Sequence, residues 1–205
     1  MATKLLNLET ERRDSILNAA LKEFVLQGYD NASTNVIAKE AAISKALMFH
    51  YVSSKQEFFF TVYDYFSNLI QKEYFDKMDY QEKDIFVKLR KSYILQIKLV
   101  EKYPFILEFE KLSKETNHKE VNEELEIRKQ NRNSNCYPKL FDNIDVNKFR
   151  KELDIEKCKQ FIFWSNVGFT NQILEKMRGH SNMSIESITS ELDGYFDELR
   201  KIFYV

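Results

Sequence analysis

The sequence predicts an all-α protein, and three observations support this. The chain of 205 residues contains only 4 Gly and 2 Pro, so few positions interrupt long helices. Apolar residues recur every three or four positions along several long stretches, which is the spacing of one helix face. Ser or Asp precedes several of these stretches, where its side chain can cap the first free N–H groups of a helix. We therefore expect a small three-helix domain followed by a larger helical bundle.

The first helix is expected from about Glu9 to Leu26, after a short mobile arm of residues 1–8. Gly28 follows it and suits a helix C-terminal cap, because glycine reaches left-handed backbone angles without a steric penalty. The expected inner face repeats at helical spacing and consists of Ile16, Leu17, Ala20, Leu21 and Phe24.

Two short helices joined by a tight turn are expected next. Ser33 or Thr34 can cap the first, and Ser44 can cap the second, which ends at Tyr51. Alanines on the facing sides let the two helices approach closely, as a helix-turn-helix requires when its second helix enters a DNA major groove. Ser54 and Lys55 then begin the next helix.

The remaining helices follow from apolar spacing and from caps. Pro104 suits a first helical turn, whereas Pro138 should kink or interrupt the helix that contains it. Asp154 and Ser184 are expected to cap the last two helices, and Gly179 to close the first of these. The expected helices are Lys55–Lys77, Gln81–Lys102, Pro104–Lys114, His118–Asp142, Ile155–Arg178 and one that begins after Ser184, with a loop over Asn143–Asp154.

Residues 13–62 resemble the DNA-binding domain of the TetR family of bacterial transcriptional regulators. The resemblance covers about a quarter of the chain and rests on many matches in order, which is more specific than a single short motif. The matching residues are Ile16, Leu17, Ala19, Ala20, Phe24, Gly28, Tyr29, Ser33, Ile37, Ala38, Ala41, Ile43, Ser44, Lys45, Phe49, His50, Tyr51, Ser54, Lys55, Glu57 and Phe58.

Three residues depart from the family pattern. Ala42 stands where the turn glycine is usual, so the turn must form without a residue that adopts positive φ cheaply. Ala46 replaces a common glycine and favours helix. Phe49 replaces the usual tyrosine and therefore lacks the hydroxyl that would hydrogen-bond a phosphate.

The resemblance implies the organisation and the partners of the protein. It implies a helix-turn-helix DNA-binding domain over residues 9–55, with the motif at about 33–52, and an effector-binding and dimerisation domain over 56–205. The helix 55–77 would connect the two domains. The implied activity is that of a repressor that binds a palindromic double-stranded DNA operator as a homodimer and is released by a small hydrophobic or aromatic effector.

The second helix of the motif and its flanks carry the expected DNA contacts. Lys45, Leu47 and His50 would face base edges, and hydroxyl and cationic side chains around them would hold phosphates. The alternative is an ordinary helical hairpin, and the even charge of residues 1–60, with seven Lys or Arg against seven Asp or Glu, mildly favours it. The predicted DNA-binding residues are Ser33, Thr34, Ser44, Lys45, Leu47, Phe49, His50, Tyr51 and Lys55.

Two further sites are expected in the C-terminal part, although each of their residues has plain core packing as its alternative. Aromatic side chains near a few polar groups would form an effector pocket, and surplus apolar faces on the last two helices would form a four-helix dimer interface. The pocket residues are Tyr93, Phe105, Phe109, Phe141, Phe161, Trp164, Ser165, Phe169 and Gln172. The interface residues are Phe161, Ile162, Phe169, Ile173, Met177, Leu192, Tyr195, Phe196, Leu199 and Phe203.

Composition argues against several other classes. Neither a phosphate-binding glycine loop nor metal-type spacing occurs among the three histidines, His50, His118 and His180, and the two cysteines, Cys136 and Cys158. We expect two reduced thiols, no cofactor, no metal, no catalytic residues and no membrane span, and hence a cytoplasmic protein. Two alternatives stay open: a protein of this fold that acts through protein partners, and a small helical enzyme that uses the aromatic residues.

Overall fold

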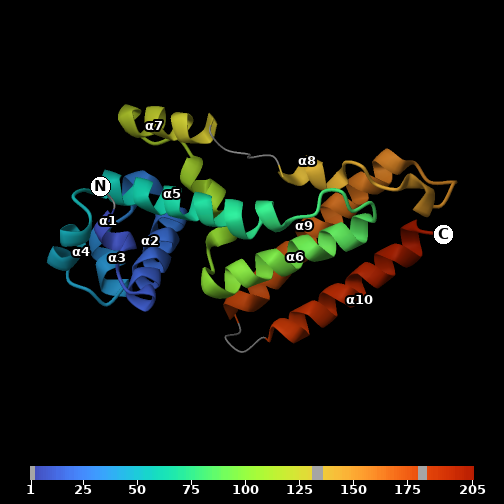
Figure 1. Cartoon of the computed structure of the whole chain (residues 1–205), viewed down its shortest axis with the longest axis horizontal. Helices are drawn as coiled ribbons and strands as arrows, with labels where there is room; N and C mark the ends of the chain where they lie inside the picture. Colours follow the sequence, from blue (N-terminus) through green and yellow to red (C-terminus); the bar gives the residue numbers. More distant parts are fainter. Residues whose placement is uncertain (1–2, 131–135, 180–183) are drawn as a thin grey trace. The chain divides into compact units, whose positions relative to one another are not determined.

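The described part of the chain is mostly helical. The computed structural model describes residues 3–130, 136–179 and 184–205, and within these ranges the only β-type pairing is an isolated bridge between Phe149 and Tyr204. The predicted all-α class is therefore confirmed (Figure 1).

The chain forms two compact units. The first contains residues 1–75 and 99–134, and the second contains 76–98 and 135–205. This structural division differs from the functional division predicted after Lys55, which stays a prediction.

The first unit contains the predicted helix-turn-helix region. The expectation of a mobile arm is wrong for residues 3–6, which form a helical turn in which Leu5 is fully buried, while residues 1 and 2 lie outside the described part. Its elements are α1 (Thr3–Leu6), α2 (Thr10–Asn31), α3 (Thr34–Glu40), α4 (Lys45–Tyr51), α5 (Lys55–Glu73), the 3-10 helix η2 (Ile106–Ser113) and α7 (Lys119–Gln130).

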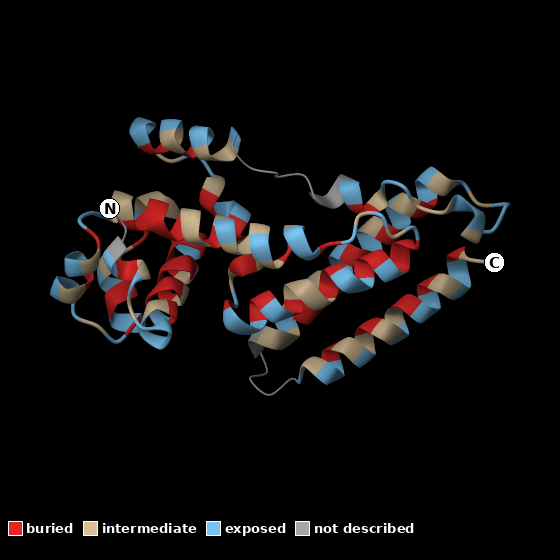
Figure 2. Ribbon diagram, in the orientation of Figure 1, coloured by how far each residue is buried: buried red, intermediate tan, exposed pale blue. Residues whose placement is uncertain are grey.

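The core of the first unit is built around aromatic rings. Phe24 of α2 packs edge-to-face against Phe58 and Phe59 of α5, with ring centroids 6.0 and 5.1 Å apart. All three rings are buried, and Figure 2 shows buried residues along α2 and the first part of α5. Aromatic pairs in this geometry add stabilisation beyond their buried area. The rings therefore fix α2 on the long helix α5.

The second unit contains most of α6 (Ile85–Lys102), then α8 (Cys136–Phe141), the 3-10 helix η3 (Val146–Lys148), α9 (Ile155–Gly179) and α10 (Ile185–Phe203). The predicted caps of α9 and α10 are present. The Asp154 carboxylate accepts from the N–H groups of Glu156 and Lys157, and the Ser184 hydroxyl accepts from the Ser187 N–H.

Several predicted boundaries are wrong. The connector helix ends at Glu73, and a 3-10 turn, η1 (Phe75–Lys77), follows it. Helix α6 begins at Ile85 instead of Gln81, because the Asp84 carboxylate accepts from the N–H groups of Phe86 and Val87 and so caps the helix there.

Within the segment predicted as one helix over 118–142, the described helices are α7 and α8, and residues 131–135 lie outside the described part. The side chains of Cys136 and Pro138 and the whole of His180 lie outside the described part, whereas Cys158 is a buried free thiol. The segment predicted as helix over 104–114 adopts the tighter 3-10 form.

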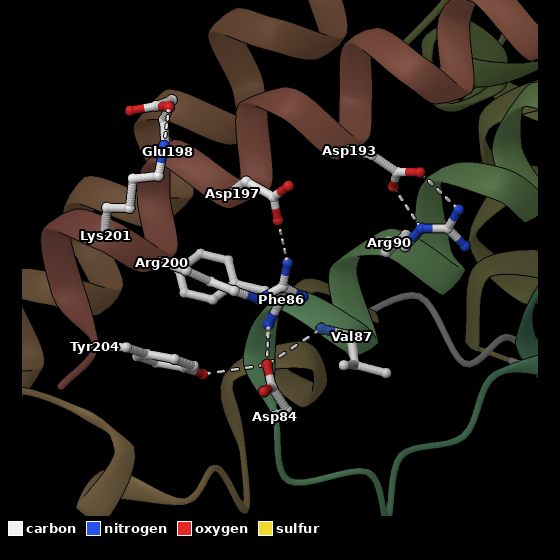
Figure 3. Close-up of polar contacts among 10 residues, drawn as sticks. All are labelled: Asp84, Phe86, Val87, Arg90, Asp193, Asp197, Glu198, Arg200, Lys201 and Tyr204. Atoms are coloured by element: carbon white, nitrogen blue, oxygen red, sulfur yellow. Dashed lines mark hydrogen bonds and ion pairs between the residues drawn. The ribbon is translucent and has the colours of Figure 1, made fainter.

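Polar contacts join α6 to α10 inside the second unit (Figure 3). Arg90 makes a forked pair with Asp193, at 2.5 and 2.9 Å. At the start of α6, Asp84 accepts from the Tyr204 hydroxyl and pairs with Lys148 at 2.7 Å. Burial alone would raise the pKa of Asp84, but the hydrogen bond and charge of Lys148 and the N–H groups of Val87 and Phe86 together outweigh it, so this pKa lies below its ordinary value. The start of α6 is thus tied to the end of the chain.

Candidate nucleic-acid interface

Both short helices of the motif are capped as the sequence predicts. The Ser33 hydroxyl accepts from the Val36 N–H at 3.5 Å, and the Ser44 hydroxyl accepts from the Leu47 N–H at 3.1 Å. These caps satisfy N–H groups that have no partner inside the helix. Seven-residue helices are too short to be stable alone, so the caps and the turn hold them in place.

The turn between the two helices is a Schellman motif built on alanine. Ala42 has φ 53°, in the left-handed region where a glycine is usual. The N–H of Ile43 bonds the Ala38 carbonyl at 2.9 Å, and the N–H of Ala42 bonds the Lys39 carbonyl at 3.2 Å. The turn therefore keeps the hydrogen bonds of the glycine form while placing a Cβ where it is strained.

Helix α4 exposes most of its surface. Met48 is its only buried residue, whereas Lys45, Phe49 and His50 are exposed. The Lys45 ammonium lies 6.0 Å from the centroid of the Phe49 ring, one helical turn away, which is within cation–π range. Phe49 therefore orients a cation on this surface, although it lacks the tyrosine hydroxyl.

Charges around the motif are distributed unevenly. Three carboxylates near the motif are engaged inside the unit: Glu23 accepts from the Ser33 N–H, Glu40 pairs with Lys22, and Glu57 accepts from the Ser53 N–H. Among the described residues, Lys39 and Lys45 make neither an ion pair nor a hydrogen bond. The even charge count of the sequence thus hides two free cations on the motif.

Lys55 has a different environment from the one predicted. Its ammonium donates to the Asp30 carbonyl at 3.1 Å and lies 5.0 Å from the centroid of the Tyr29 ring. Burial lowers the pKa of Lys55, although the charge of Asp30 opposes the shift. Lys55 therefore joins the end of α2 to the start of α5, and its role as a phosphate contact stays a prediction.

The remaining predicted DNA contacts lie on or beside the same surface. Ser44 is exposed, whereas Ser33, Thr34, Leu47 and Tyr51 are partly buried. The Tyr51 ring contacts the His50 ring edge-on, with centroids 5.8 Å apart. The structure thus brings the predicted residues of α3 and α4 together on one motif.

The predicted effector-pocket residues are divided between the units. Phe105 and Phe109 belong to the first unit, where Phe109 packs against Tyr63. The others belong to the second unit, in which Tyr93 and Phe169 are buried with ring centroids 5.8 Å apart. Phe141 is half-buried there beside Phe163, and four pocket residues are exposed on α9: Phe161, Trp164, Ser165 and Gln172.

Most of the predicted dimer residues are buried within the chain itself. Those buried are Ile162, Phe169, Ile173, Leu192, Phe196, Leu199 and Phe203, while Met177 and Tyr195 are half-buried. Phe161 is the exception, because 52% of it is exposed beside Trp164, of which 58% is exposed. The exposed apolar surface of α9 is therefore smaller than the sequence predicts.

One polar network was not predicted from the sequence. The Tyr103 hydroxyl donates to the Asp14 carboxylate at 3.1 Å and lies 3.0 Å from the Tyr65 hydroxyl, and Lys102 pairs with Asp14 at 2.7 Å. The Asn18 amide donates to the Lys102 carbonyl. These contacts tie α2 to α5 and to the last residues of α6. No local pattern could have predicted them, because Asp14 and Tyr103 are 89 residues apart.

Two negative observations complete the description. No helix within the described ranges is both long and apolar enough to cross a membrane. No cluster of three or more His, Cys, Asp and Glu residues in the described part of the chain could hold a metal ion.

Capped short helices, a tight turn and an exposed second helix with free cations define a helix-turn-helix protein. Residues 16–62 match the sequence model described as "Bacterial regulatory proteins, tetR family". This match covers the three helices of the motif region and the start of α5, so this part of the chain is similar to the DNA-binding domain of the TetR family. No curated protein sequence matches the chain.

Solved structures support the fold over nearly the whole chain. The ketosteroid transcriptional regulator KstR2 of Mycobacterium tuberculosis is 16% identical, with 97% of each chain covered and a TM-score of 0.60. AibR in complex with isovaleryl coenzyme A and operator DNA is 18% identical, covers 90% of this chain and 97% of its own, and has a TM-score of 0.55. PfmR of Thermus thermophilus is 20% identical, with 91% and 97% covered and a TM-score of 0.52. At these identities the likeness shows a shared fold.

Proposed function

We propose that the protein is a ligand-responsive repressor that binds a palindromic operator as a homodimer. One observation carries the proposal: α4 is exposed, with Lys45 unpaired, while neighbouring carboxylates are engaged within the unit. A fold that keeps cations free on an exposed helix of this motif is suited to the phosphates and base edges of a DNA major groove.

In the proposed complex, α4 of each protomer enters one half-site. Lys45 and His50 would contact base edges, and Ser33, Thr34, Ser44 and Tyr51 would hold phosphates. Leu47 would contact a thymine methyl group. Two protomers would place their α4 helices about 34–36 Å apart, one DNA turn, which explains the palindrome.

The homodimer and its effector belong to the same proposal. Phe161 and Trp164, exposed on α9 with ring centroids 5.9 Å apart, support an apolar dimer contact in the second unit. Phe169 and Tyr93 support a hydrophobic or aromatic effector there. AibR, which has a similar fold, was solved in complex with isovaleryl coenzyme A and operator DNA, so this fold can bind both kinds of ligand. An effector acts by binding one conformation better than the other.

We infer a non-enzymatic protein of the cytoplasm, where operator DNA is accessible. The test is fluorescence anisotropy with labelled fragments of the DNA upstream of its own gene. We expect one fragment to bind more tightly than the rest, with affinity that falls steeply as salt rises, because protein cations displace counterions from phosphates.

Flat titrations of every fragment at low salt would contradict DNA binding. They would favour the alternative in which this fold acts through a protein partner. Turnover of a small molecule in the absence of DNA binding would favour the enzyme alternative instead.

A further inference from the structure

A groove of about 610 Å³ lies within the first unit, and none of the predicted pocket residues lines it. One wall is a ridge of α5 that begins at Glu57 and ends at Lys72. Leu6 of α1 and Arg128 of α7 complete the lining. This volume is in the range of small-molecule sites.

The groove has a rigid wall at the α7 side. The Arg128 guanidinium makes a forked pair with Asp64, at 2.8 and 3.2 Å, and also pairs with Glu124. It lies 4.3 Å from the centroid of the Phe60 ring. Because two carboxylates neutralise Arg128, this end of the groove offers no free cation to a ligand.

The opposite end of the groove offers a free cation, the ammonium group of Lys72. Lys72 makes no hydrogen bond or ion pair with any described residue, and the Asn68 amide lies one helical turn before it. Lys72 lies twelve residues after Phe60, a distance of about 18 Å along a helix that rises 1.5 Å per residue. Tyr65, Leu69, Phe60 and Leu6 supply apolar surface between the two ends.

We propose that this groove binds an elongated amphipathic carboxylate. The carboxylate would lie at Lys72 and Asn68, and the apolar chain would run past Leu69 toward Leu6. The opposite orientation would place the ligand's negative charge beside Glu57 and Asp64 and is therefore disfavoured.

The groove has a direct connection to the DNA-binding motif. Helix α1, which supplies Leu6, packs against α4. Glu57, at the other end of the lining, holds the backbone of Ser53 immediately after α4. A ligand that favours one position of α1 would therefore change the operator affinity, a consequence that rests on the proposed function.

The binding itself is tested on the full chain without DNA, so that its failure is distinct from failure of the proposed function. Dodecanoate, below its micelle concentration, is titrated by calorimetry. We expect one site per chain, weakened about tenfold or more by Lys72→Glu. Asn68→Trp, at an exposed position, should abolish binding by filling the groove. Dodecyltrimethylammonium, which has the same chain with a cation, should bind more weakly than dodecanoate.

Lys98→Glu is the matched control, since Lys98 is an exposed lysine of the second unit. It should leave dodecanoate binding unchanged. The proposal would be overturned if the wild type did not bind dodecanoate, or if all three variants bound dodecanoate equally. Equal affinity for dodecanoate and dodecyltrimethylammonium would also overturn it.

Discussion

Helices α4 and α10 differ in what holds them in place. Helix α10 has 19 residues and buries Ile188, Leu192, Phe196, Leu199 and Phe203, spaced by three or four positions. Helix α4 has 7 residues, buries only Met48, and depends on the Ser44 cap and the Ala42 turn. Packing stabilises α10, whereas most of the α4 surface is not needed for folding. The comparison teaches that a helix held by its ends leaves its face available to a partner.

The largest expected effect is the loss of a ring from α10. Phe196 is 1% exposed and contacts Phe86 and Tyr93, with ring centroids 6.0 and 5.9 Å away. Phe196→Ala should lower the free energy of unfolding by about 3–5 kcal/mol, because the cavity cannot close fully. Urea denaturation followed by circular dichroism measures this. Phe49→Ala on α4, the control, should change the free energy of unfolding by less than about 0.5 kcal/mol, and equal losses would remove the distinction.

An intermediate loss of stability is expected when the hydrogen bond between Tyr103 and α2 is removed. Tyr103→Phe removes hydrogen bonds to Asp14 and Tyr65 and leaves the ring in place. The free energy of unfolding should fall by about 1–3 kcal/mol, because a buried carboxylate loses a donor. Thermal unfolding measures the change. Tyr204→Phe, which removes a hydroxyl bonded to Asp84 in the second unit, is a matched control for loss of one hydroxyl.

The same network should make stability depend on pH. Burial alone would raise the pKa of Asp14, but hydrogen bonds from Lys102 and Tyr103 outweigh it and keep the pKa below its ordinary value of 3.8. A lowered folded-state pKa stabilises the protein above the unfolded pKa, and this stabilisation is lost as pH falls through the folded value. Asp14→Asn should therefore be less stable than wild type near neutral pH, and the difference should shrink below about pH 4. A constant difference down to about pH 2 would contradict this account of Asp14.

The smallest expected effect concerns the turn before α4. Ala42→Gly removes the left-handed strain of a Cβ at φ 53° but increases the freedom of the unfolded chain. The net result should be a gain of up to about 1 kcal/mol in the free energy of unfolding, measured by urea denaturation. Ala46→Gly, inside α4, should instead destabilise by about 1 kcal/mol. If Ala42→Gly also destabilises, the turn is not strained.

Local chemistry was readable from the sequence. The caps at Ser33, Ser44, Asp154 and Ser184 were predicted because a capping side chain acts on N–H groups two or three residues away. The start of α6 was misplaced, although Asp84 is the same kind of local cap.

Contacts between distant residues could not be predicted. Lys55 looked like a free cation, because nothing local shows that the Asp30 carbonyl and the Tyr29 ring lie beside it. The even charge count was misleading for the same reason. A count does not show that Glu40 is paired with Lys22, whereas Lys45 has no ion pair in the described structure. The spacing of aromatic residues likewise does not distinguish a core position from a surface position. Phe196 lies in the core, whereas Trp164 lies on the surface.

The most direct measurement compares operator affinity and stability in one variant of α4, Lys45→Ala with His50→Ala. Anisotropy with the preferred DNA fragment should show a loss of about 100-fold or more, since each base or phosphate contact contributes about 1–3 kcal/mol. Urea denaturation should show a change in the free energy of unfolding below about 0.5 kcal/mol, because both side chains are exposed. Lys98→Ala should change neither quantity. A double variant that binds the operator as tightly as wild type would contradict the assignment of α4 as the reading helix.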